Sequence, residues 1–276
     1  MPLNYKGLYV ASWNDFLGIE SSENHLLSYA AKNGFTTLTL YNIQKVLKKG
    51  EITTETTNQL AHFISKARTI YKIPHITAVA ENADFFTNVI SKYNHVRKNP
   101  SEAFDAYNVE FEFWNMDPIE QYYYEDYLKP LGLQCNTADA YKFFISQMKL
   151  VHTLAKVDGV KCETYVGSPT DIQAKGILPY IDRVLIHAYV KDPATSYAYC
   201  RDRLRYFGTA GKVNIIIIFS AEEEFSGPWL SQHKEPDAYQ AFLKGYNVTP
   251  TTWKKNNITL QGYQWYVDNV MPMPLV

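Results

Sequence analysis

Short apolar segments alternate with longer segments of helical periodicity along the chain, and this alternation is the strongest constraint on its fold. Eight segments have the length and composition of strands. They are Gly7–Ser12, Phe35–Ile43, His75–Glu81, Asp105–Asn115, residues 160–167, Arg183–Val190, Val213–Ser220 and Leu260–Asp268. Strands separated in this way by helices favour a parallel sheet that is covered by helices.

Helical patterns fill the intervals between these strands. We expect helices over residues 21–34, 53–71, 83–99, 137–159, 194–208 and 235–246, and a short one from Thr170. Ser21 or Ser22 opens the first of them, with Ser22 a candidate N-cap and Gly34 a candidate stop.

Eight strands and about seven helices in 276 residues predict a single-domain (β/α)8 barrel over residues 1–276. The alternative is an open, doubly wound sheet, which usually carries a glycine-rich loop after its first strand. Here that loop reads SWNDFLGIESS and contains one glycine, so the barrel is favoured.

Composition narrows the functional classes. The net charge is −1 without a long basic run, which gives no support to a nucleic-acid or membrane-surface partner. Three widely spaced cysteines indicate neither a disulfide framework nor a zinc site, and no cofactor motif is present. We expect no transmembrane segment and assume a monomer. The first residues do not resemble a signal peptide, so a secreted or periplasmic location would require that one had been removed.

The fourth expected strand, DAYNVEFEFWN at Asp105–Asn115, carries an unusual pattern of acids. Strand side chains alternate between faces, so Asn108, Glu110 and Glu112 share one face and three apolar residues share the other. We expect the polar face to point into the barrel, with Glu112 at its C-terminal rim, where barrel enzymes place their active sites.

This stretch resembles the D-x-x-D-x-D-x-E signature of family 18 glycoside hydrolases, the chitinases and endo-β-N-acetylglucosaminidases. The chain reads D-x-x-N-x-E-x-E, which keeps the frame and the final acid. GLYVASW resembles the opening strand of the family, HAYV keeps the tyrosine of its strand six, and WYVD keeps the W-x-x-D of its strand eight. The absence of a long insertion between strands seven and eight is typical of compact members.

The resemblance implies hydrolysis of a glycan containing N-acetylglucosamine, with the acetamido group of the sugar as nucleophile. Glu112 would then be the general acid, Glu110 would orient the acetamido group, and Tyr189 would hydrogen-bond its carbonyl. Trp265 would form the floor under the sugar, with Asp268 nearby. This function requires no metal or cofactor.

Three positions depart from the family pattern. Glu110 is one methylene longer than the usual Asp, Asn108 removes a deep charge, and Val190 stands where the family has Asp. Small displacements of a catalytic group can reduce rates strongly. Two hypotheses therefore remain: a divergent glycosidase, which we favour, and a barrel that binds carbohydrate without cleaving it.

Other side chains complete the expected cleft, and each has a structural alternative. The expected aromatic walls are Trp13, Tyr41, Trp114, Tyr189 and Trp265. His187 is a candidate ligand-binding residue, although a histidine in an apolar strand is more often structural. Glu110 and Glu112 could be structural acids, and Trp265 could simply fill the barrel. Ala221–Phe225 is expected to be a solvated loop from which one acid could reach the cleft.

Overall fold

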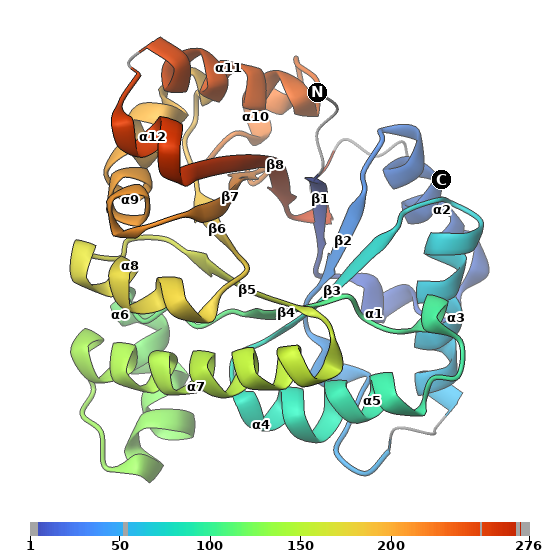
Figure 1. Cartoon of the computed structure of the whole chain (residues 1–276). Helices are drawn as coiled ribbons and strands as arrows, with labels where there is room; N and C mark the ends of the chain where they lie inside the picture. The colour runs from blue at the N-terminus through green and yellow to red at the C-terminus, as the bar shows by residue number, and fades with distance from the viewer. Residues whose placement is uncertain (1–4, 52–54, 249, 269–270, 272–276) are drawn as a thin grey trace.

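A computed structural model of the chain describes residues 5–51, 55–248, 250–268 and 271. Eight parallel strands form a closed barrel in sequence order, and β1 pairs with β8 to close the ring (Figure 1). The strands are β1 Tyr5–Val10, β2 Thr37–Leu40, β3 His75–Ala80, β4 Ala106–Val109, β5 Lys161–Val166, β6 Arg183–His187, β7 Val213–Ser220 and β8 Ile258–Tyr266. The prediction of a single-domain (β/α)8 barrel is confirmed.

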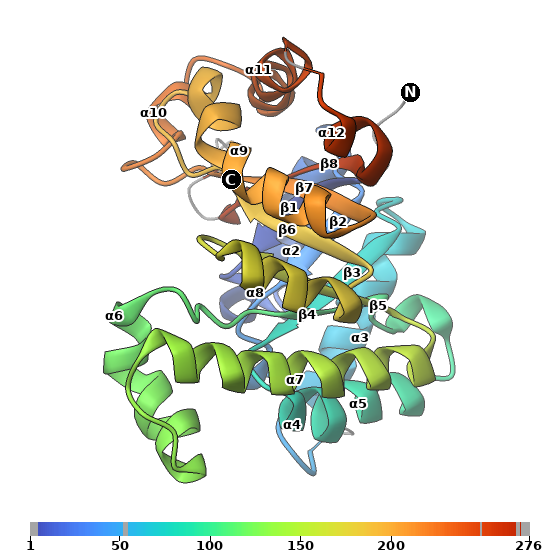
Figure 2. The same cartoon turned by 60° about the vertical axis from the view of Figure 1, so that its left-hand side comes forward.

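Helices surround the ring of strands (Figure 2). They are α1 Trp13–Phe16, α2 Glu20–Lys32, α3 Glu55–Thr69, α4 Ala83–Phe85, α5 Ser91–Val96, α6 Met116–Pro118, α7 Thr137–Asp158, α8 Asp171–Ile177, α9 Ser196–Ala210, α10 Gly227–Leu230, α11 Glu235–Val248 and α12 Thr252–Asn257. Each predicted helix has a counterpart, although residues 53 and 54 of the second lie outside the described residues. The short helices α1, α10 and α12 and the helical segment over 116–131 were not predicted.

The prediction that Ser22 caps the first long helix is wrong. Helix α2 begins at Glu20, with Ile19 at the cap position and no side-chain cap. The Glu23 carboxylate instead accepts a hydrogen bond from the Gly18 backbone N–H at 2.8 Å. This contact fixes the turn before the helix, so the helix starts two residues before Ser22.

From the end of β4 onward, apolar and polar side chains lie on opposite faces of the chain. Val109, Phe111 and Phe113 are fully buried in the apolar layer between the barrel and the helices. The ring centroid of Phe111 lies 4.9 Å from that of Phe143 on α7, the long helix that packs against β4 and β5. The expected outward direction of these apolar side chains is confirmed, and the alternate residues therefore point into the barrel.

A polar network fills the barrel below the carboxyl ends of the strands. Gln264 Oε1 accepts hydrogen bonds from the hydroxyls of Tyr5 and Thr39, each at 2.9 Å. Arg183 donates from Nε to Glu163 at 2.5 Å, and its guanidinium lies 4.8 Å from the centre of the Tyr5 ring. These contacts pair buried polar groups and fill the interior with side chains, as in other small barrels.

Candidate functional site

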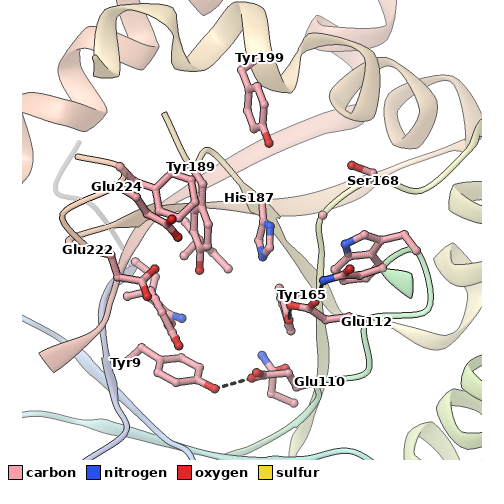
Figure 3. A pocket seen from close by; sticks show the side chains of 18 residues that line it. Tyr9, Glu110, Glu112, Tyr165, Ser168, His187, Tyr189, Tyr199, Glu222 and Glu224 are labelled. Carbon is pink, nitrogen blue, oxygen red and sulfur yellow. Dashed lines mark hydrogen bonds between the residues drawn. The ribbon is translucent and has the colours of Figure 1, made fainter. Parts of the chain in front are cut away.

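A cavity of about 410 Å³ opens at the carboxyl ends of the strands (Figure 3). It lies at the position where barrel enzymes place their active sites. Its lining consists of Tyr9, Asn108, Glu110, Glu112, Trp114, Asn115, Tyr165, Gly167, Ser168, His187, Tyr189, Tyr199, Ile218, Glu222, Glu224, Phe225, Gln264 and Tyr266. Six of the ten predicted site residues are among them: Asn108, Glu110, Glu112, Trp114, His187 and Tyr189.

Glu110 lies deep in this cavity and is tied to the opposite wall. Its Oε2 accepts a hydrogen bond of 2.5 Å from the Tyr9 hydroxyl on β1 (Figure 3). Burial raises the pKa of Glu110 from its ordinary 4.5 to about 8, and repulsion from Glu112 and Glu81 adds to this against the lowering effect of the Tyr9 hydrogen bond. Glu110 is therefore mostly protonated at neutral pH.

Glu112 sits closer to the rim and is held from two sides. Tyr165 on β5 donates its hydroxyl to Oε1, and Asn115 donates from Nδ2 to Oε2 at 2.7 Å. The backbone N–H of Glu112 is bonded to the Tyr123 hydroxyl at 3.3 Å. Fixing both oxygens restricts the side chain to one position, which suits a group that must meet a reacting atom.

His187 and Tyr189, at the end of β6, form a stack of rings along one wall. His187 is stacked on Tyr189 at 4.2 Å and on Tyr165 at 4.8 Å between ring centroids. Burial, with a smaller contribution from Arg203, lowers the pKa of His187 to about 3, so its imidazole is neutral. Flat rings of this kind can pack against the apolar face of a sugar.

The loop after β7 brings two further acids to the cavity. Ser226 donates its N–H to Ser220 O at 3.1 Å, which closes a tight turn. Within that turn the Ser220 hydroxyl donates to Glu222 Oε2 at 2.8 Å. Figure 3 shows Glu222 across the cavity from Glu112. The loop is solvated as expected, since Glu223 and Glu224 are exposed, but two of its acids, Glu222 and Glu224, line the cavity where the sequence suggested one.

Four predicted site residues are not part of the cavity lining, and the predicted position of Trp265 as its floor is wrong. Trp265 is fully buried on the outer face of β8, where its ring lies 5.4 Å from that of Phe219 and its Nε1 donates to Glu235 O. Gln264 and Tyr266 occupy the inner face, so alternation forces Trp265 outward.

The other three lie around the first two βα loops or at the end of β8. Trp13 is fully buried in the apolar layer and donates from Nε1 to Tyr41 O. The Tyr41 ring packs on that of Tyr9, with 5.6 Å between the ring centroids. Asp268 is buried and accepts hydrogen bonds from Ala11 N and the Ser12 hydroxyl, which secures the loop after β1.

Of the predicted aromatic walls, Trp114 and Tyr189 line the cavity, and other tyrosines take the places expected for Trp13, Tyr41 and Trp265. Tyr9, Tyr165, Tyr199 and Tyr266 line the cavity and were not predicted as site residues. Strand alternation could have identified two of them. Tyr9 lies two residues after Gly7 and Tyr165 two residues after Glu163, so each shares the inward face of its strand. Tyr266 carries no such signal, since its orientation depends on an irregularity within β8.

The described residues contain neither a cluster of metal ligands nor a helix able to span a membrane. Among them, no three His, Cys, Asp or Glu side chains are grouped to hold a metal ion. No helix in the described ranges has the length and apolar character needed to cross a bilayer.

Comparison with known proteins supports the fold. No protein-family model matches the sequence, and no curated protein matches it. A family 5 glycoside hydrolase from Bifidobacterium longum, solved with mannosyl-β-1,4-N-acetylglucosamine, aligns over 96% of this chain and 69% of its own at 12% identity, with a TM-score of 0.57. A β-glycosidase aligns over 97% of this chain and 87% of its own at 11% identity, with a TM-score of 0.54.

An enzyme from Alicyclobacillus herbarius gives a TM-score of 0.54 over 97% of this chain and 88% of its own, at 9% identity. The TM-scores establish a shared barrel architecture. At such low identities they establish nothing beyond the fold, because this fold hosts many activities. The chain therefore has a barrel fold that it shares with glycoside hydrolases. The family 18 resemblance rests on the sequence motif alone.

The protonated state of Glu110 predicts a pH-dependent stability. Between pH 5 and 8 the unfolded chain has lost the Glu110 proton while the folded chain keeps it, so the free energy of unfolding falls as pH rises. Relative to Glu110→Gln, which preserves the acceptor for Tyr9, the wild type should lose up to about 1.4 kcal/mol per pH unit in this range. Partial exposure to cavity water makes this an upper limit.

Urea unfolding of both proteins at four pH values measures this difference. Glu120→Gln, on the exposed surface nearby, is the control and should track the wild type. A constant difference between wild type and Glu110→Gln from pH 5 to 8 would show that Glu110 is ionised in the folded state.

Proposed function

We propose that the chain is a glycoside hydrolase that acts on glycans containing N-acetylglucosamine, with Glu112 as the proton donor to the leaving oxygen. The observation that carries the proposal is the position of Glu110 and Glu112 on the inner face after β4, in an aromatic cavity at the carboxyl ends of the strands. Glycoside hydrolysis commonly uses a pair of carboxyl groups, and aromatic rings can pack against the sugar.

The two glutamates take different roles in this proposal. Glu112 is nearer the rim and is fixed by Tyr165 and Asn115, so it can meet a glycosidic oxygen in a defined direction. Glu110 lies deeper and would contact the 2-acetamido group of the sugar. A positive charge that develops on the substrate beside Glu110 favours its ionised form, which would in turn stabilise that charge.

Tyr189 and Tyr266 complete the proposed sugar site. Both line the cavity, and their rings lie 6.0 Å apart at an angle of 28°. Tyr189 would hydrogen-bond the acetamido carbonyl, as the family 18 resemblance implies. Because Trp265 faces the helices, we assign the stacking surface under the sugar to Tyr266.

Replacement of Glu112 by Gln should abolish turnover and leave binding intact. We expect at least about a hundredfold loss of kcat on a fluorogenic chitobioside, the usual scale for a general acid. The affinity for a chitin oligomer, followed by tryptophan fluorescence, should change little because Gln retains the shape of the side chain. Glu120→Gln is the matched control and should cleave as fast as the wild type.

If the wild type and Glu112→Gln both bind chitin oligomers and N-glycopeptides yet cleave neither, the chain is a sugar-binding barrel without hydrolase activity. Equal cleavage by both proteins would remove Glu112 from the mechanism.

A second mechanism is favoured by the position of Glu222. Retaining glycosidases that do not use the acetamido group need a second carboxylate as nucleophile, on the far side of the sugar from the acid. Glu222 lies across the cavity from Glu112 and is oriented by Ser220. In this alternative Glu222 attacks the anomeric carbon, and the substrate does not require an acetamido group.

Covalent labelling separates the two mechanisms. An activated 2-deoxy-2-fluoro glucoside should modify Glu222 if it is the nucleophile, and peptide mass spectrometry would locate the added sugar. A label on Glu222, lost in Glu222→Gln but kept in Glu223→Gln, supports the two-carboxylate mechanism. Cleavage of acetamido glycosides without any label supports assistance by the substrate.

A further inference from the structure

The cavity is electrostatically one-sided. Glu112, Glu222 and Glu224 line it together with Glu110, which is mostly protonated at neutral pH, and its lining within the described residues includes no lysine or arginine. The imidazole of His187 does not offset these acids, because burial keeps it neutral at physiological pH. The protein thus gathers acids around a ligand-sized space without supplying the opposite charge.

Two arginines that contact residues of the barrel, Arg203 and Arg183, are engaged elsewhere. Arg203 donates to the backbone carbonyls of His187 at 2.6 Å and Tyr199 at 3.0 Å. Its guanidinium therefore stabilises the backbone of the cavity wall and does not face the ligand space. Arg183 is paired with Glu163 in the polar network below. Neither guanidinium lines the cavity.

A second feature of the lining also points to a ligand that donates hydrogen bonds. Asn108 is only 3% exposed and lines the cavity, yet its Oδ1 accepts no hydrogen bond from any described residue. An unpaired buried acceptor is unfavourable unless a ligand or water satisfies it. The rings of Tyr189 and Tyr266 are a further surface that attracts cations.

We propose that the natural substrate carries free amino groups, as in a partly de-N-acetylated oligomer of glucosamine. This inference rests on the proposed function and specifies its substrate class. An N-acetylated sugar would occupy the cleavage position beside Glu110 and Glu112. The ammonium group of a neighbouring glucosamine would lie near Glu222 and Glu224, where attraction between opposite charges favours it. Sugars that carry carboxylate or sulfate groups are repelled from the same cavity.

The test compares two chitin-derived tetramers that differ only in charge: one fully N-acetylated, and one with free amino groups on two of its four sugars. Stopped-flow tryptophan fluorescence gives the dissociation constant of each for the wild type before turnover. At low salt the amino tetramer should bind at least about tenfold more tightly, and this preference should shrink at high salt because the Debye length shortens. The N-acetylated tetramer is neutral, so its affinity should depend little on salt.

Variants of one loop provide a matched comparison. Glu223 and Glu224 are both exposed, but only Glu224 lines the cavity, so Glu224→Gln removes a charge of the cavity and Glu223→Gln removes one outside it. Glu224→Gln should reduce the preference for the amino tetramer about threefold, the scale of a partly exposed charge pair, and Glu223→Gln should leave it unchanged.

Two outcomes would overturn this inference in distinguishable ways. If the N-acetylated tetramer is bound and cleaved, and the amino tetramer binds no more tightly, the substrate class is wrong while the proposed function stands. If neither tetramer binds, both the substrate class and the proposed function are contradicted.

Discussion

The packing of Phe111 and Phe113 into the apolar layer determines how the rest of the site is arranged. Both rings are fully buried against α7 and its neighbours, and this anchors the chain that follows β4. Because side chains alternate, Glu110 and Glu112 must then face the interior. A slip of one residue would place two carboxyl groups in the apolar layer, at a cost of several kcal/mol for each buried charge.

Hydrogen bonds from tyrosine hydroxyls reduce the cost of placing Glu110 and Glu112 inside the barrel. Tyr9 on β1, across the cavity, donates a hydrogen bond to Glu110, and Tyr165 on the adjacent β5 donates one to Glu112. A phenol satisfies a carboxyl oxygen without neutralising it, whereas a lysine or arginine would form an ion pair and fill the cavity. The chain thus keeps an acidic, aromatic and open space at the carboxyl ends of its strands, which is the property on which both proposals depend.

Sequence patterns were sufficient for the fold and for the β4 side of the site. Strand and helix periodicity gave the barrel, and the alternation in DAYNVEFEFWN gave the inward direction of Asn108, Glu110 and Glu112. These features are local, so they can be read from consecutive residues. The interpretation of Ser22 as an N-cap failed because a carboxylate within the helix, Glu23, fixes the preceding turn instead.

The opposite side of the cavity depends on features that a single sequence does not reveal. In β8 the pairing with β7 steps from Leu260 directly to Gly262, so Gln261 is bulged and the alternation resets before Trp265. Glu222 is held at the cavity by the Ser220 hydroxyl, in a loop that the Ser226 N–H closes onto Ser220 O. Three consecutive glutamates otherwise look like a solvated loop.

The central claim is that Glu112 meets a glycosidic oxygen inside the cavity at the carboxyl ends of the strands. A crystal structure of Glu112→Gln with a bound chitin tetramer tests this most directly. We predict that the oligomer occupies the cavity, with one glycosidic oxygen within about 3 Å of the side chain at position 112 and a sugar ring against Tyr266. A tetramer bound outside the cavity, or one with no glycosidic oxygen in reach of position 112, would contradict the account.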